Sequence, residues 1–228
     1  MIRKKYALED YNKKEAFHDA TKIFIIYEGI DREPNYFQAF NDAFLDPKKA
    51  YVHHVLDGHS GIVGNMPINL KDRAKAFLAN PPEDIKVTPS KEDKFRFVLD
   101  VDKHPLEQIQ ILKDFSDGLP DSSLFISNYC FEVWIWFHLD EQIKMTATKC
   151  KELKTILGTK QNGKGIANFP YSYMSTDLIY QAIDRAEAAD IDKEDYFPVE
   201  KSTKVYLLMK ELLEYSIENK TVKEPKIL

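Results

Sequence analysis

With 228 residues, the chain can build one large hydrophobic core, or a main domain with a helical appendage, but hardly two large independent domains. Hydrophobic residues make up 43% of the sequence and include 14 Phe and 12 Tyr, which excludes a disordered or fibrous protein. The formal net charge of −5 means that no protein-wide positive field attracts nucleic acid, so any such binding must be local.

The sequence contains no segment suited to crossing a membrane. Its longest apolar run, residues 131–139, is interrupted by polar residues and falls short of the roughly 20 residues that a membrane helix needs. The basic residues 1–11 lack the apolar part of a secretory signal. Two cysteines are too few for a disulfide scaffold, so we expect a cytoplasmic protein in which Cys130 and Cys150 are buried or inert thiols.

The first predicted element is a buried parallel strand at 22–27, an apolar and aromatic run that ends abruptly in Glu28 and Gly29. A helix should follow from Pro34, because aromatic residues then recur at helical spacing. A second strand is expected at 51–56, and a short helix at 70–78.

The same alternation continues in the middle of the chain. Residues 94–101 are typical of another buried strand, and the apolar pattern from Leu106 to Phe115 predicts a helix that Gly118 closes. A fourth short strand is expected at 124–127. Strands that alternate with helices predict an α/β fold, with a mainly parallel sheet, right-handed crossovers and helices on both faces.

The rest of the chain is expected to be helical. For residues 130–139 we favour a helix capped by Asn128, and two later helices should be capped by Thr176 and by Ser202 or Thr203. The predicted organisation is a basic N-terminal extension at 1–20, a catalytic core at 21–140, and a helical C-terminal region at 141–228 packed on that core.

Acidic residues follow two of the predicted strands. Asp100 and Asp102 lie at the carboxyl end of the strand that starts at Lys94, and the period of two points both side chains to the same side. Glu28 occupies the equivalent end of another strand, and such ends converge on the ligand crevice of open α/β sheets. Carboxylates this close repel each other unless a cation such as Mg²⁺ lies between them. A DxD pair alone is also common in solvated turns, so the placement at strand ends carries the inference.

Four sequence blocks extend this pattern: IIYEGIDREPNYFQAF (25–40), FVLDVDKH (97–104), ISNYCFEVWIWFH (126–138) and STKVYLLMKEL (202–212). A strand ending in Glu-Gly, followed later by a strand ending in Asp-Val-Asp, resembles the TOPRIM domain. Together the blocks resemble RloB-like proteins over nearly the whole chain. Tyr129 departs from the family's pattern, which has proline there; this alters the loop and not the acids.

The resemblance to RloB-like proteins and to the related OLD-type TOPRIM nucleases implies a TOPRIM-like, Rossmann-like fold. It also implies metal-dependent cleavage of phosphodiester bonds in DNA or RNA, with Mg²⁺ or Mn²⁺ as cofactor, and a role in defence against phage or foreign DNA. A partner ATPase of the AAA or ABC type is implied as well, and a homo-oligomer stays open.

Within that chemistry, Asp100 and Asp102 would hold the metal, and Glu28 would be a ligand or general base. Glu132 stands in an apolar block where a buried carboxylate needs a metal, Arg or Lys partner; we expect a second-site ligand, with a structural ion pair as the alternative.

Other polar residues near these acids have two readings each. Lys103 and His104 could contact the substrate phosphate or the leaving oxygen, or be loop surface. Glu33 could add an outer hydrogen bond, or stabilise the start of its helix.

Several further features have a bland interpretation beside the functional one. The lysine-rich window 144–164 could contact phosphates or be a solvated helix and loop. Trp134 and Trp136 could stack on bases, but aromatic residues in so apolar a run favour the core. Zinc is not expected at His53, His54 and His59, because neighbouring strand residues point to opposite faces and no cysteine or HxxxH pattern accompanies them.

Two other functional classes compete with the nuclease. A catalytically silent subunit would keep the fold and work by contacting an ATPase or nucleic acid. A glycosyl- or nucleotidyltransferase would use the DxD for a nucleotide diphosphate, but the early Glu-Gly strand end is then unexplained. A haloacid-dehalogenase-like phosphatase is disfavoured, since its DxD belongs on the first strand.

Overall fold

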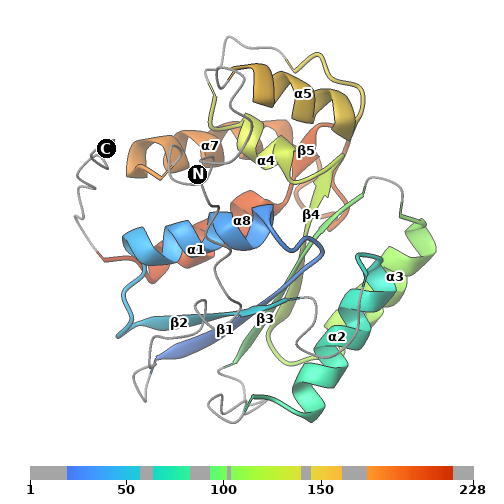
Figure 1. Cartoon of the computed structure of the whole chain (residues 1–228), viewed down its shortest axis with the longest axis vertical. Coiled ribbons are helices and arrows are strands. Elements are labelled where there is room, and N and C mark those ends of the chain that lie inside the picture. The colour runs from blue at the N-terminus through green and yellow to red at the C-terminus, as the bar shows by residue number, and fades with distance from the viewer. Residues whose placement is uncertain are drawn as a thin grey trace, which may run out of the picture.

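The computed structural model describes residues 20–56, 64–82, 93–101, 104–139, 145–160 and 174–217. Its centre is a five-stranded sheet with the order β2-β1-β3-β4-β5 (Figure 1). β1, β2, β3 and β4 pair in parallel, and β5 pairs antiparallel with β4. The expected α/β fold with a mainly parallel sheet is therefore confirmed. The strands are β1 (Thr21–Tyr27), β2 (Ala50–Val55), β3 (Lys94–Asp100), β4 (Ser122–Asn128) and β5 (Ser202–Thr203).

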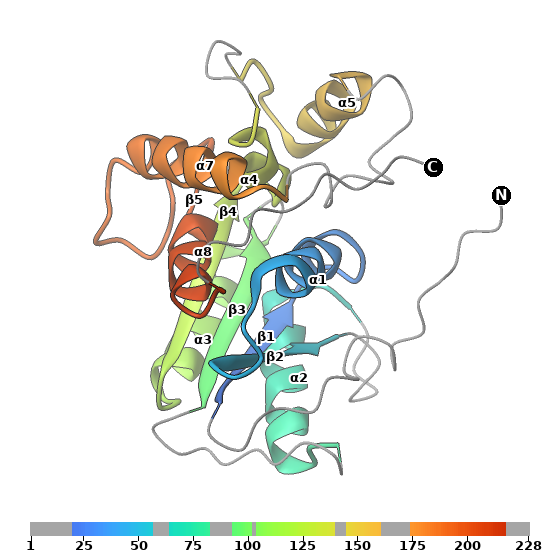
Figure 2. The same cartoon turned by 90° about the vertical axis from the view of Figure 1, so that its left-hand side faces the viewer.

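Helices cover both faces of this sheet. α1 and α8 lie on one face, α2 and α3 lie on the other, and α4, α5 and α7 gather beyond the end of β4 (Figures 1 and 2). The helices are α1 (Arg32–Phe44), α2 (Pro67–Ala79), α3 (Leu106–Asp117), α4 (Glu132–Trp136), α5 (Cys150–Lys160), α7 (Thr176–Ala189) and α8 (Val205–Glu214). No helix in the described part of the chain is long and apolar enough to span a membrane.

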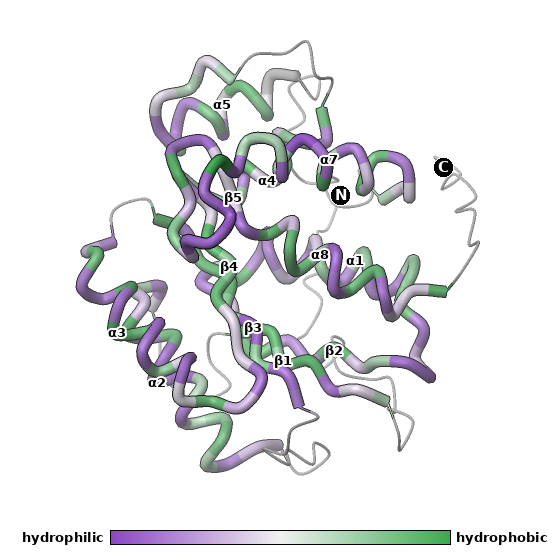
Figure 3. Tube along the Cα trace, turned by 180° about the vertical axis from the view of Figure 1, so that it is seen from behind, coloured by the Kyte–Doolittle hydropathy of each residue, from purple (hydrophilic) through white to green (hydrophobic). Residues whose placement is uncertain are grey.

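The period of two along the strands divides the interior into two apolar cores. In β1, Ile23, Ile25 and Tyr27 face the core under α1 and α8, while Phe24 and Ile26 face the core under α2 and α3. The helices show the matching stripes, with hydrophobic and hydrophilic segments alternating along α2 and α3 (Figure 3). Because both faces are covered, the strands can be apolar at nearly every position.

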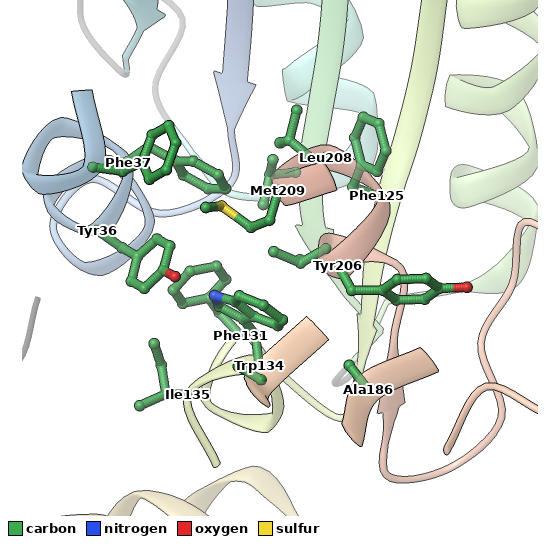
Figure 4. Packing of buried hydrophobic residues seen from close by; sticks show 14 of the residues in the cluster. Tyr36, Phe37, Phe125, Phe131, Trp134, Ile135, Ala186, Tyr206, Leu208 and Met209 are labelled. Atoms are coloured by element: carbon green, nitrogen blue, oxygen red, sulfur yellow. The ribbon is translucent and has the colours of Figure 1, made fainter. Parts of the chain in front are cut away.

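The larger core is rich in aromatic side chains. Tyr36 of α1 makes edge-to-face contacts with Phe131 and Trp134, which lie at the start of α4 and within it (Figure 4). Both tryptophans are buried, so the interpretation of Trp134 and Trp136 as core residues is the one that the structure supports. This packing fixes α4 against α1 and therefore the position of Glu132, the first residue of α4.

The three predicted helix caps are wrong, and the first two are those at Asn128 and Thr176. Asn128 ends β4 and donates a hydrogen bond to the Pro198 carbonyl, while the helix expected over 130–139 is reduced to Glu132–Trp136. Ser175, not Thr176, is the N-cap of α7, and its hydroxyl accepts from the Leu178 amide at 3.2 Å. The Thr176 prediction was displaced by one residue, which is the usual uncertainty of a helix end.

The cap predicted at Ser202 or Thr203 is also wrong, because these residues form β5 and the N-cap of α8 is Lys204. The Thr203 hydroxyl nevertheless accepts from the Val205 amide at 3.1 Å and meets the Ser127 hydroxyl of β4 at 2.8 Å. The side chain that suggested a cap therefore also joins α8 to the sheet.

Candidate functional site

The candidate site lies at the carboxyl ends of β1 and β3, which are neighbours in the sheet. From β1 the sheet extends to β2 on one side and to β3 and β4 on the other, so the strand order reverses at β1 and β3. Crevices at such reversal points are the usual ligand sites of open α/β sheets. Glu28 directly follows β1, and Asp100 is the last residue of β3.

The Glu28 carboxylate bridges the two strand ends. One oxygen accepts a hydrogen bond from the Asp100 amide at 2.8 Å, and the other lies 2.9 Å from His104 Nε2. The Glu28 amide in turn donates to the Val98 carbonyl at 3.0 Å, continuing the sheet by one residue. The structure therefore brings Glu28, Asp100 and His104 together, at positions the sequence had singled out separately.

Glu33 adds a third acid. It lies in the first turn of α1 and is buried, and its carboxylate approaches the backbone at Gly29: a Cβ atom on Gly29 would lie 2.2 Å from Glu33 Oε2. Burial raises the pKa of Glu33 to about 7, and the negative charge of Glu28 adds to this. Glu33 thus lies with Glu28 and Asp100, and these three residues are called the acid cluster below. Its position in the first turn of α1 is the one expected from the sequence.

Asp100 experiences the same accumulation of negative charge. Burial raises the pKa of this carboxyl group well above its usual value, and the nearby charges of Glu28 and Glu33 raise it further. The Lys154 ammonium acts in the opposite direction. Glu28, Glu33 and Asp100 therefore bring three carboxyl groups together, and a cation bound among them would be favourable.

A buried arginine anchors the end of β1 beneath these acids. Arg73 of α2 donates to the Tyr27 carbonyl at 2.6 Å and to the Gly64 carbonyl at 2.8 Å. Gly64 has a φ of 121°, and a Cβ there would lie 2.2 Å from Asn69 Nδ2, so only glycine suits this turn. The backbone directly before Glu28 is therefore held from the α2 side of the sheet.

Glu132 has cationic partners. Its side chain is only 2% exposed; one oxygen pairs with Arg32 of α1, and the other lies 3.7 Å from Lys154 Nζ of α5. The sequence required a metal, Arg or Lys partner for this carboxylate, and the structure supplies both an Arg and a Lys. Whether Glu132 also acts as a metal ligand stays a prediction.

Cys130 and Cys150 lie beside Glu132, and all three ligand atoms are within 4.8 Å of one another. Both cysteines are buried, as expected. A hydrogen bond with Cys150 raises the pKa of Cys130, and burial and the charge of Asp100 raise it further. The two thiols are therefore neighbours at the edge of the acid cluster, which their separation of 20 positions in the sequence gave no reason to expect.

Other predicted residues lie elsewhere or outside the described residues. Asp102, Lys103 and His59 fall outside them, as do the ends of the 144–164 window, of which α5 forms the centre. His53 and His54 are buried in β2, where the rings pack on Phe77 and Tyr27 respectively.

Comparison with known proteins agrees with the blocks quoted from the sequence. A family model described as RloB-like protein matches residues 23–212. The chain belongs to the RloB-like proteins. The matched part of this RloB-like chain includes Glu28, Glu33, Asp100, His104 and Glu132. No curated protein and no solved structure matches the chain.

Sequence reasoning did not find the cations of the site individually. Arg32 was not singled out, and Lys154 was only one lysine of a basic window. The usable signal was indirect: a carboxylate in an apolar block demands a cationic partner, but nothing local says which one. Arg32 is 100 residues from Glu132 in the chain, so only the packing of α1 on α4 identifies it.

Proposed function

We propose that this RloB-like chain is a metal-dependent nuclease that cleaves phosphodiester bonds in DNA or RNA. The observation that carries the proposal is the Glu28 carboxylate at the end of β1, which accepts a hydrogen bond from the Asp100 amide at the end of β3 and acts electrostatically on the Asp100 carboxyl group. Two acids from separate parts of the sequence thus meet at the reversal point of a parallel sheet, where a substrate can approach.

The donor atoms suit a hard divalent cation. Glu28 and Asp100 offer carboxylate oxygens, which Mg²⁺ and Mn²⁺ prefer, and Asp102 is the third expected ligand. The raised pKa values of Asp100 and Glu33 support the same conclusion, because a cation would relieve the repulsion that burial and proximity create. When bound, the metal supplies charge neutralisation for the scissile phosphate and acidifies a water molecule.

The remaining roles follow from the contacts of this chain. His104 holds one oxygen of Glu28 and so orients the carboxylate, while the Asp100 amide holds the other. Glu33 lies against Gly29, and its charge when ionised acts on Asp100 and favours a bound cation. We further propose, from the resemblance of the family blocks, that the protein acts in defence against phage or foreign DNA, with a partner ATPase.

The test compares the wild type with Asp100→Ala in Mg²⁺ or Mn²⁺, on plasmid, single-stranded DNA and RNA. A nuclease should lose activity by orders of magnitude, because the variant lacks a carboxylate that binds the metal. Asp42→Ala is the matched control: it removes an exposed carboxylate of α1 that accepts from Gln38, and it should cleave like the wild type. If the wild type leaves every substrate intact even with the partner ATPase present, the chain is a catalytically silent subunit and the proposal is wrong.

A further inference from the structure

We propose that Arg32 and Lys154 form a phosphate-binding pair, held in place by Glu132, at the edge of the acid cluster. The inference deepens the proposed nuclease function and rests on it for the identity of the ligand, a phosphodiester group of DNA or RNA. It assigns Glu132 a positioning role, different from the metal ligand expected from the sequence.

Glu132 and its two cationic partners differ in their exposure to solvent. The Glu132 side chain is 2% exposed, whereas Arg32 and Lys154 are 35% and 39% exposed. A buried carboxylate with two cations on its outer side fixes their positions, while the cations keep surface available for another anion. Arginine presents five N–H donors and lysine three. Lys154 also interacts with the Cys150 side chain, and after these contacts donors for a phosphate remain on both cations.

The two cations act electrostatically on the acids of the site. The charge of Lys154 lowers the pKa of both Asp100 and Glu33, and the charge of Arg32 lowers that of Glu33. Both cations therefore lie within electrostatic range of the acid cluster. Arg32 begins α1 four residues after Glu28, and Lys154 comes from α5, so the pair draws on two separate elements.

The balance of charge at Glu132 favours an anion over a metal ion as the ligand. Cys130, Cys150 and Glu132 could in principle hold a soft metal, since their ligand atoms lie within 4.8 Å of one another. A divalent cation there would, however, face Arg32 and Lys154 at the same carboxylate. Because these two cations already neutralise Glu132, the charge of the cluster favours an incoming anion over a further cation.

In this arrangement, metal binding and phosphate binding fall to different residues of the proposed nuclease. Acids at the ends of β1 and β3 are suited to a metal, and a basic pair beside them is suited to a phosphate of the same strand. The net charge of −5 excludes attraction by the whole protein, so a local pair of this kind is what nucleic-acid binding requires.

The test measures binding without cleavage. Fluorescein-labelled single-stranded DNA and RNA oligonucleotides are titrated with the full chain in EDTA, and the dissociation constant is followed by anisotropy as a function of salt. Arg32→Gln and Lys154→Gln should each weaken binding about tenfold, the effect of one charge-assisted hydrogen bond. Each should also make the slope of the logarithm of the binding constant against the logarithm of the salt concentration less steep, by about 0.7, the value for one phosphate contact on a single strand.

Three further variants separate this role from others. Lys149→Ala removes an exposed lysine of the same segment that pairs with Glu152, and it should leave both affinity and slope unchanged. Lys154→Arg should restore the slope. Each single substitution leaves one cation on Glu132, so the variants should stay folded, which thermal unfolding checks. Glu132→Gln should weaken oligonucleotide binding while leaving Mn²⁺ affinity, measured by calorimetry, at the wild-type value.

The outcomes are distinct. Any of four results would overturn the phosphate-binding pair. These are equal effects of Lys154→Gln and Lys149→Ala on binding, an unchanged salt slope in the Arg32→Gln and Lys154→Gln variants, loss of Mn²⁺ affinity in Glu132→Gln, and stoichiometric zinc that Cys150→Ser removes. If the wild type binds through these cations but never cleaves, the proposed nuclease function is wrong and the phosphate-binding pair stands. If the wild type cleaves, and Lys154→Gln has the KM and the salt slope of the wild type, the phosphate-binding pair is wrong and the nuclease function stands.

Discussion

Gly29 shows how one residue without a side chain makes room for an acid. The Glu33 carboxylate occupies the volume that a Cβ atom would fill at this position, with Oε2 at 2.2 Å from it. A distance this short requires movement of the carboxylate or of the backbone. Because Glu33 lies in the first turn of α1 and is buried, little space is available for such a shift. The Glu-Gly sequence at the end of β1 is therefore a packing requirement of the acid cluster.

Gly29→Ala should destabilise the protein by about 1–3 kcal/mol, the usual cost of adding a methyl group to a filled site. It should also reduce cleavage, since Glu33 and then Glu28 are displaced. Urea unfolding and the nuclease assay measure the two effects. Gly158→Ala in α5 is the control: nothing lies within 4 Å of its added Cβ, and alanine should gain up to about 1 kcal/mol of helix stability. Equal changes in stability for the two variants would contradict the packing argument.

The sequence predicted part of the site for a local reason. Glu28 directly follows the apolar strand β1, and Asp100 is the last residue of the apolar strand β3. The ends of neighbouring parallel strands meet, so their proximity could be expected. The pairing of Glu132 with Arg32 and Lys154 could not, because it depends on how α1, α4 and α5 pack. Residue types could be inferred from electrostatics, whereas the choice of partner is a property of the tertiary structure.

At the scale of elements, periodicity predicted the long segments and failed on the short ones. β1, β3 and α1 carry strong apolar patterns over many residues, and their observed bounds lie close to the expected ones. β5 has only two residues and exists because Ser202 and Thr203 pair with β4. α4 is five residues long, held by contacts with α1. Such elements owe their conformation to distant partners, which no local pattern records.

The connection between α7 and α8 depends on a buried ion pair. Lys204, the N-cap of α8, donates to both oxygens of Asp190, the C-cap of α7, at 2.8 and 2.7 Å. Tyr206 donates to the same carboxylate at 2.9 Å. The Lys204 and Asp190 side chains are 2% and 1% exposed, so each charge is stabilised almost entirely by its protein partners.

Lys204→Met should therefore cost about 3–5 kcal/mol of unfolding free energy, because it leaves the Asp190 carboxylate buried without its cation. Adding Asp190→Asn should recover part of this loss by removing the charge. Lys210→Met is the matched control, since its partner Glu187 is one-third exposed and such pairs contribute less than about 1 kcal/mol. Urea unfolding compares the four proteins. A cost for Lys204→Met no larger than that for Lys210→Met would show that the buried pair is not important for stability.

At the scale of the whole molecule, the sheet separates two apolar cores, and polar contacts join the elements around the larger one. The larger core contains two buried histidines, and each forms a hydrogen bond with a tyrosine hydroxyl. His54 Nδ1 lies 2.7 Å from the Tyr27 hydroxyl, and His138 Nε2 lies 3.0 Å from the Tyr36 hydroxyl. Burial lowers the pKa of each histidine to about 3, and for His138 the charge of Arg185 lowers it further. These pairs join β1 to β2 and α1 to the segment after α4.

The two histidines make the fold sensitive to acid. In the unfolded chain a histidine takes up its proton near pH 6.5, but in the folded chain these two do so only near pH 3. Their contribution to stability is therefore fully present above about pH 6.5 and is lost progressively as the pH falls towards 3. By about pH 5 the loss should be roughly 2 kcal/mol for each histidine.

The double variant His54→Asn, His138→Gln tests this by comparing how unfolding free energy depends on pH. The variant is expected to be less stable at neutral pH, because the rings fill the core, but its stability should fall less steeply below about pH 6.5. Glu33, whose raised pKa favours the folded state as the pH falls, is present in both proteins, so its effect cancels in the difference. Above about pH 7 the two curves should run parallel, since both histidines are then neutral in folded and unfolded chains. Parallel curves down to about pH 4 would mean that the acid sensitivity has another source, and that the two rings do not stay neutral in the folded core.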